Sequence, residues 1–129
     1  MTQEPLERFA LATAKLKRFS ARAMELPGRD GGLRVVLQGH LDGEAANAAM
    51  DPLVALVGAW DGSPRLTVAL EGLDYISSMG IGLLARAAAA ARSRGITMHL
   101  EAPQPSVLKV LDLLGIPQYI PIVGAGKKE

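Results

Sequence analysis

The segment LTVALEGLDYISSMGIGLLAR, residues 66–86, constrains the fold of this chain more than any other part of it. Its first seven residues, LTVALEG, form a short and mostly apolar run that predicts a strand buried on both faces. Such a strand is typical of a central position in a parallel sheet. A short turn with two adjacent serines follows, and a glycine-containing helical segment begins directly after them. The turn therefore lies at the carboxyl end of a strand, where α/β sheets place their sites.

Ser77 and Ser78 occupy the position at which this helix is expected to begin. The first backbone N–H groups of a helix have no partner within it, and the helix dipole favours negative charge there. A serine at this point can therefore carry a phosphate. Position alone favours a simpler role, because serine is also a preferred N-cap residue, and the two roles can coexist. No base, metal ligand or cofactor motif lies nearby in sequence, so we expect neither serine to be a nucleophile.

The composition indicates one soluble domain and excludes several classes of function. The chain has 129 residues, of which 49% are hydrophobic, so it can bury a substantial core. A net charge of +1 and five scattered aromatic residues give neither a basic stripe nor a base-stacking platform for nucleic acid. The absence of cysteine excludes disulfides, thiolate metal sites and cysteine nucleophiles. No signal peptide or membrane-spanning run is found, so we expect a cytoplasmic protein without membrane insertion.

The rest of the sequence predicts alternating strands and helices. We expect an antiparallel hairpin of strands 19–26 and 33–41 about the turn PGRDGG, and then, in order, a helix over 47–60, a strand over 66–72, a helix from the serines to Arg94, a strand over 96–102, a helix over 105–114 and a strand over 119–123. This order predicts an α/β domain over residues 19–123, with helices packed on a mixed, mainly parallel sheet. A tail over 124–129 follows it.

Three local features leave alternatives open. Residues 1–18 form an N-terminal arm with helical spacing over 5–17, which is either a docking or dimer-forming arm or an unpacked extension. The helix over 47–60 begins either with Asn47 as its cap or with Asp51 as its cap and Pro52 as its first residue. In the helix after the serines, the expected buried side chains are those of Ile81, Leu84, Ala85 and Ala88.

Three segments resemble the STAS domain family, and within it the bacterial anti-sigma factor antagonists. They are GHLDG at 39–43, LEGLDYISSMGIGLL at 70–84 and VLDLLGI at 110–116, and the resemblance covers residues 19–123. Members of that family carry the motif Asp-Ser-Ser/Thr-Gly, followed by an apolar residue and a second glycine. The serine in the second position of this motif is phosphorylated. The resemblance thus implies that Ser78 is the phosphoacceptor, with Ser77 as the second candidate. Ser77 replaces the usual aspartate and Met79 the usual serine or threonine.

The resemblance implies a protein that acts by binding rather than by catalysis. One partner would be an anti-sigma factor that is also a serine kinase; it phosphorylates the protein and then releases it. The other partner would be a phosphatase that removes the phosphate. The partner-binding surface would comprise His40, which stands in place of the family's usual glutamate, together with Asp42, Ser77, Ser78, Met79, Gly80, Ile81 and Gly82. Two other STAS functions stay open: an accessory subunit of an ABC-type lipid transport complex and an unphosphorylated scaffold of a stress-signalling assembly. A homodimer through the N-terminal arm is a further expectation.

Enzyme, cofactor and metal functions are not expected. The nucleophile-elbow pattern Gly-x-Ser-x-Gly does not surround Ser78, and the glycines at 80 and 82 lack the Lys-Ser/Thr of a phosphate-binding loop. Tight packing between helix and sheet is the expected reason for both glycines. His40 and His99 lie on different predicted strands, without a carboxylate cluster at ligand spacing, so we expect no metal site.

Overall fold

A mixed sheet of six strands organises the part of the chain that the computed structural model describes, residues 3–28 and 31–124. In chain order the elements are α1 (Gln3–Leu11), β1 (Phe19–Leu26), β2 (Gly32–Leu41), α2 (Gly43–Ala59), β3 (Arg65–Ala69), β4 (Leu73–Ile76), α3 (Ser78–Ser93), β5 (Thr97–Glu101), α4 (Pro105–Leu113), a 3₁₀ turn (Ile116–Gln118) and β6 (Ile122–Val123). Residues 125–129 of the predicted tail at 124–129, the first two residues of the arm and residues 29–30 of the hairpin turn lie outside the described residues.

The strand order is β1-β2-β3-β5-β6, and β4 pairs with β2. β1 and β2 form the predicted antiparallel hairpin, and the other pairings are parallel, as expected. β2 is the longest strand and has two parallel partners in succession. Its first half pairs with β3 and its end pairs with β4.

β4 is an element that the sequence analysis did not predict. The apolar run of 66–72 leaves the sheet after Ala69, where the N–H of Leu70 still donates to the carbonyl of Glu101 at 2.9 Å. A turn closed by the N–H of Leu73 and the carbonyl of Leu70 then returns the chain to β2 as β4. The strand has only four residues, two of them exposed, so it lacks the apolar alternation by which longer strands are predicted.

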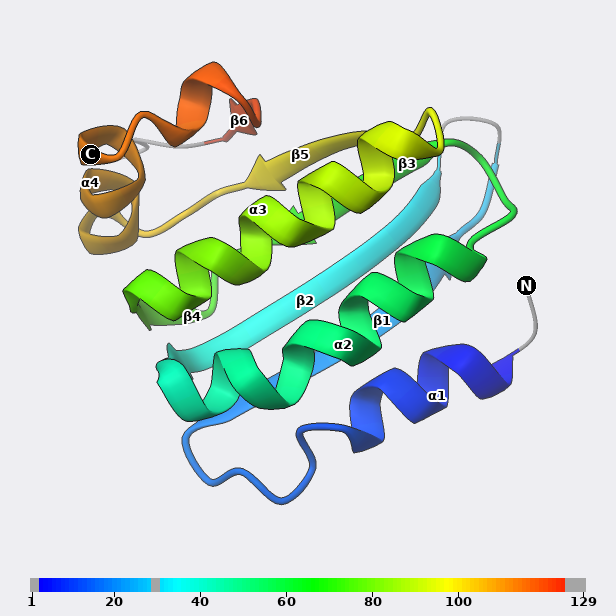
Figure 1. Cartoon of the computed structure of the whole chain (residues 1–129), viewed down its shortest axis with the longest axis horizontal. Coiled ribbons are helices and arrows are strands. Elements are labelled where there is room, and N and C mark those ends of the chain that lie inside the picture. The colour runs from blue at the N-terminus through cyan, green and yellow to red at the C-terminus, as the bar shows by residue number, and fades with distance from the viewer. Residues whose placement is uncertain (1–2, 29–30, 125–129) are drawn as a thin grey trace.

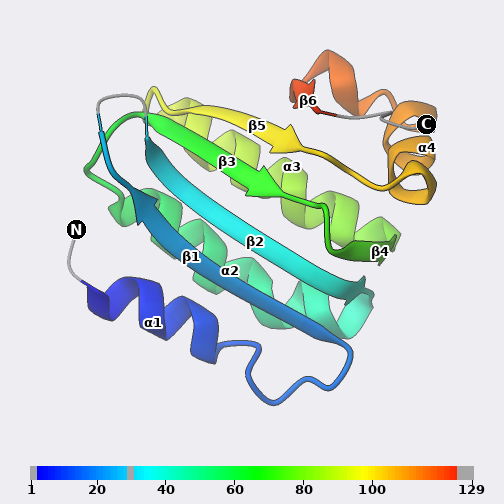
Figure 2. The same cartoon turned by 180° about the vertical axis from the view of Figure 1, so that it is seen from behind.

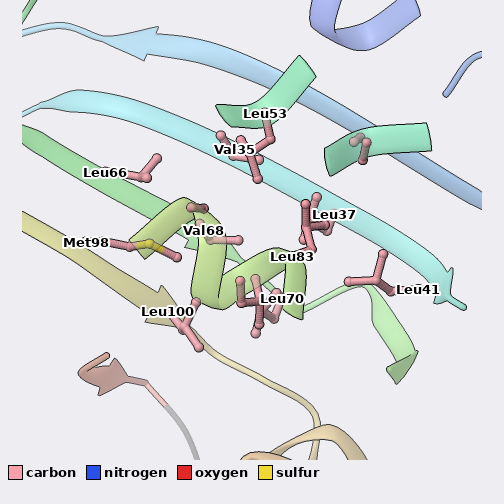
Figure 3. Close-up of a cluster of buried hydrophobic side chains, with 14 of the residues drawn as sticks. Val35, Leu37, Leu41, Leu53, Leu66, Val68, Leu70, Leu83, Met98 and Leu100 are labelled. Carbon is pink, nitrogen blue, oxygen red and sulfur yellow. The ribbon is translucent and has the colours of Figure 1, made fainter. Parts of the chain in front are cut away.

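The main core lies between the sheet and the two helices α2 and α3, which cover one of its faces (Figure 1). Figure 2 shows the other face of the sheet, in front of which no helix of the described part passes. Alternate residues of β2, Val35, Leu37 and Leu41, point toward the helices and are fully buried. They meet Leu53 of α2 and Leu83 of α3 in the cluster drawn in Figure 3.

α2 begins four residues before the predicted start. Its N-cap is Asp42, whose carboxylate accepts a hydrogen bond from the backbone N–H of Ala45 at 2.9 Å. Neither Asn47 nor Asp51 is the cap, and Pro52 lies inside the helix. An interior proline costs about 3 kcal/mol. The helix tolerates this cost because its buried face continues on both sides of the proline, with residues such as Ala45 before it and Leu53 after it.

The buried face of α3 is rotated relative to the prediction. Its buried residues are Gly80, Leu83, Leu84, Ala87 and Ala91. Of the four predicted residues only Leu84 is fully buried, and Ala85 is exposed. The observed buried face includes Gly80, which the prediction omitted: a Cβ on it would lie 2.8 Å from side-chain atoms of Ile76 and Leu41.

The arm packs on the rest of the domain. Leu6 and Phe9 of α1 are buried in the core cluster. After α1, the hydroxyl oxygen of the buried Thr13 accepts a hydrogen bond from the N–H of Ala21 in β1 at 3.1 Å. The helix ends at Leu11, earlier than the predicted residue 17, because short turns lead from there to Thr13 and β1.

The C-terminal strand is shorter than predicted. Tyr119 is the C-cap of the 3₁₀ turn, and only Ile122 and Val123 pair with β5. Pro121 has no N–H to donate, although its carbonyl accepts from the N–H of Leu100 at 2.9 Å. α4 lies beside β4, as Figures 1 and 2 both show.

Candidate functional site

Two turns at the carboxyl ends of β2 and β4 form the candidate site. β2 ends at Leu41 and leads through Asp42 into α2, and β4 ends at Ile76 and leads through Ser77 into α3. The backbone N–H of Ser77 donates to the carbonyl of Leu41 at 2.9 Å. The pairing of β2 with β4 therefore sets the first turns of α2 and α3 side by side, and joins the two predicted motifs in one surface.

Ser77 and Ser78 have different environments. Ser77 is the N-cap of α3 with extended backbone angles, φ −92° and ψ 173°, and its hydroxyl oxygen accepts from the N–H of Gly80 at 3.1 Å. Ser77 is half-buried, whereas Ser78, the first residue of α3, is exposed. The predicted capping role thus belongs to Ser77. Ser78 is thus exposed at a helix N-terminus.

The two glycines of the motif also differ. A Cβ on Gly80 would lie 2.8 Å from Cγ1 of Ile76, 2.8 Å from Cγ of Leu41 and 3.0 Å from the carbonyl oxygen of Leu41. Gly80 thus lets the start of α3 approach both strands, as expected. A Cβ on Gly82 would meet no atom within 4 Å, so the packing explanation is wrong for Gly82.

Met79 connects the two turns on the surface. Its side chain is 50% exposed, and its Sδ lies 3.3 Å from where a Cβ on Gly43 would be. The methionine therefore lies across the start of α2. Ile81, one helical turn after Ser78, is half-buried. Together with Ser78 and Gly82, these residues form a small, weakly polar surface, with no acidic residue in the first turn of α3.

His40 faces β4. Its Nδ1 lies 2.7 Å from Oδ1 of Asp74, and its ring centroid lies 5.6 Å from that of Tyr75. The strand pairing shifts register between Gly39 and His40, where Gly39 has φ +96° and a Cβ would lie 2.1 Å from the carbonyl oxygen of Arg18. Only glycine fits there. The imidazole of His40 thus already contacts a carboxylate.

Sequence reasoning missed two contributions to this surface. Asp74 and Tyr75 are exposed on the unpredicted β4, beside His40. The basic residues at the end of the arm border the site: a cavity of about 330 Å³ is lined by Lys15, Leu16, Lys17, Arg18, Phe19, His40, Asp42, Glu44 and Ala45. The sequence could have indicated that these basic residues border the site, because Arg18 directly precedes β1, which pairs with the end of β2.

The described residues contain no group of three or more histidines and carboxylates placed to hold a metal ion. Across the same part of the chain, none of the helices combines the length and the apolar character that crossing a bilayer requires.

Comparisons with known proteins agree on one fold. The family described as STAS domain matches residues 23–125, while curated proteins give no match. Among solved structures, the chain is similar to the anti-sigma factor antagonist SpoIIAA in its unphosphorylated form, with a TM-score of 0.64 and 20% identity over 77% of this chain and 84% of that chain. An anti-sigma factor antagonist from Mycobacterium paratuberculosis gives a TM-score of 0.62 and 23% identity, over 80% and 85% of the two chains. The phosphorylated form of the Bacillus SpoIIAA gives 0.55 and 21%, over 77% and 87%. At these identities the similarities show the fold alone.

Proposed function

Because the chain belongs to the STAS domain family, as its motifs indicated, we propose that it is an anti-sigma factor antagonist switched by phosphorylation of Ser78. Its activity is binding, not catalysis, and it needs no cofactor. The unmodified form captures an anti-sigma factor in the cytoplasm and so frees a sigma factor for transcription. The same anti-sigma factor phosphorylates Ser78 and dissociates, and a phosphatase restores the unmodified form.

The observation that carries this proposal is the exposure of Ser78 within a weakly polar surface. Ser78 is exposed while the adjacent Ser77 is half-buried and caps α3 through its own oxygen. Around it lie the exposed side chain of Met79 and the half-buried Ile81 and Gly82. Such a surface can pack closely against a partner, and a kinase can reach the hydroxyl when the partner site is open.

The charge of a phosphate explains why it would end the complex without unfolding the domain. A phosphoserine carries about −1.5 to −2 charges at pH 7. At the first position of α3 the free N–H groups and the helix dipole accommodate this charge, and no acidic residue of the first turn repels it. In a closed interface, by contrast, the phosphate must be desolvated or paired, which weakens docking onto an apolar or acidic face.

Ser77 is the second candidate acceptor. Its hydroxyl oxygen accepts the N–H of Gly80, and its side chain is less exposed. A phosphate there would have to be accommodated between α3 and the end of β2. The structural roles of the two serines therefore favour Ser78.

Phosphate transfer provides the direct test. Each anti-sigma factor kinase of the source organism is incubated with the protein and ATP, and the phosphorylated residue is located by mass spectrometry. We expect phosphate on Ser78, loss of it in Ser78→Ala, and retention in Ser77→Ala. Transfer that persists in Ser78→Ala and disappears in Ser77→Ala would move the site to Ser77. No transfer to either serine would contradict the switch and favour the scaffold function.

A further inference from the structure

An apolar groove lies between α1 and α2, away from the serine turn. It has a volume of about 540 Å³ and is lined by Pro5, Arg8, Phe9, Leu11, Ala12, Pro52, Ala55, Leu56 and Ala59. Figure 1 shows α1 and α2 side by side and running in opposite directions. Leu11, at the end of α1, is 71% exposed, although it lines the groove. An apolar groove thus has an apolar side chain projecting at its rim.

We propose that this groove binds a second copy of the same chain, in a two-fold dimer that places Leu11 of each copy in the groove of the other. A two-fold axis uses the same patch on both subunits, so the patch must contain both a projection and a matching recess. Leu11 supplies the projection. The recess has small side chains on its α2 wall, Ala55 and Ala59, which leave room for a leucine.

Residues of opposite charge lie at or beside the two walls of the groove. Arg8 lines the α1 rim, and the exposed Asp51 lies one helical turn before Ala55 in the same row of α2. A two-fold arrangement brings Arg8 of one copy toward Asp51 of the other. The existing contact of Arg8, with Glu4 at 2.9 Å, joins side chains that are each 75% exposed. Exposed pairs of this kind contribute little, so Arg8 can exchange partners on association.

The position of the groove leaves the serine turn available. The residues that line it on α2 begin at Pro52, whereas Asp42 caps the other end of the helix. Leu56 lies 13 residues beyond Gly43, a distance of about 20 Å along the helix. Each subunit of the dimer would therefore present its own Ser78 surface. The dimer does not depend on the function proposed for Ser78, and the two can fail separately.

Sedimentation velocity of the full chain, from micromolar to millimolar concentration, tests the proposal. We expect a monomer–dimer equilibrium in the wild type and a dissociation constant at least about tenfold weaker in Leu11→Asp. The matched control is Leu113→Asp, since Leu113 is 76% exposed on α4 and outside the groove. That variant should dimerise as the wild type does. Circular dichroism of both variants checks that they fold.

A charge exchange adds an independent readout. Arg8→Asp and Asp51→Arg should each weaken the dimer, and the double variant should recover most of the loss. A wild type that stays monomeric at every concentration would overturn the proposal and leave the groove to a partner of different sequence. Equal dimerisation of Leu11→Asp and Leu113→Asp would also overturn it.

Discussion

Replacing Gly80 by alanine tests the packing that positions the serine turn. The new methyl group would lie 2.8 Å from side-chain atoms of Ile76 and Leu41, and 3.0 Å from the carbonyl oxygen of Leu41. The side chains can shift, but the carbonyl belongs to the backbone of β2 and cannot move alone. Overpacking of this kind costs about 1–3 kcal/mol. The helix gains about 0.5–1 kcal/mol when alanine replaces glycine. The expected net destabilisation is therefore about 0–2.5 kcal/mol.

Gly82→Ala is the matched control, because it makes the same chemical change two residues later in the same helix. A methyl group on Gly82 meets no atom within 4 Å, so only the helix gain of about 0.5–1 kcal/mol applies. The helix gain cancels between the two variants. Their stabilities should thus differ by the packing cost alone, about 1–3 kcal/mol, with Gly82→Ala the more stable.

Urea denaturation followed by circular dichroism measures this difference. The slope of the transition should not change between the variants, so the shift of the midpoint reports stability. If Gly80→Ala proved as stable as Gly82→Ala, the close approach of α3 to β2 and β4 would be refuted. This close approach could then no longer explain how Ser78 is held at an ordered helix start.

Three further predictions concern single side chains. Ser77→Ala removes the N-cap oxygen of α3 and should destabilise the domain by about 1 kcal/mol in urea, with a serine-to-threonine variant retaining most of the stability. Arg94→Ala should cost about 1.5–3 kcal/mol, because the guanidinium donates to the carbonyls of Val57 and Trp60 and so joins the ends of α2 and α3. Arg94→Lys should recover part of that loss, and an unchanged urea midpoint in Arg94→Ala would contradict this role. Burial lowers the pKa of His99 below its ordinary value of 6.5, so the unfolded chain binds the proton more readily. Stability should therefore fall as the pH decreases from 6.5 toward the folded pKa, and His99→Gln should reduce this slope in thermal melts.

The fold was predictable from sequence where the apolar pattern is long or the turn chemistry is strong. The alternation of β2 and the apolar run around Val68 identified a hairpin and a central parallel strand, and both are present. β4 was not predictable, because it has four residues and takes its stability from pairing with β2. The start of α2 was missed for a related reason. The two predicted caps, Asn47 and Asp51, both placed Pro52 in the first turns of the helix. It lies in the interior instead, and burial along the whole helix outweighs its local cost.

For the candidate site, the sequence indicated the turn but not the division of roles within it. Both serines fit a helix start, and only the structure shows that Ser77 provides the cap while Ser78 is exposed. The contact between His40 and Asp74 could not be predicted, because Asp74 lies on β4, a strand that the sequence analysis did not predict. The close packing of Gly80 and the open surroundings of Gly82 depend on contacts between elements, which local sequence does not encode.

The affinity of an anti-sigma factor for the two forms of the protein tests the central claim most directly. The protein is phosphorylated on Ser78, separated from the unmodified form, and each form is titrated against the anti-sigma factor in a calorimeter. A buried, unpaired charge predicts at least about tenfold weaker binding of the phosphorylated form, with Ser78→Asp weakened in the same direction and Ser78→Ala unchanged. Equal affinity of the phosphorylated and unmodified forms would contradict the account.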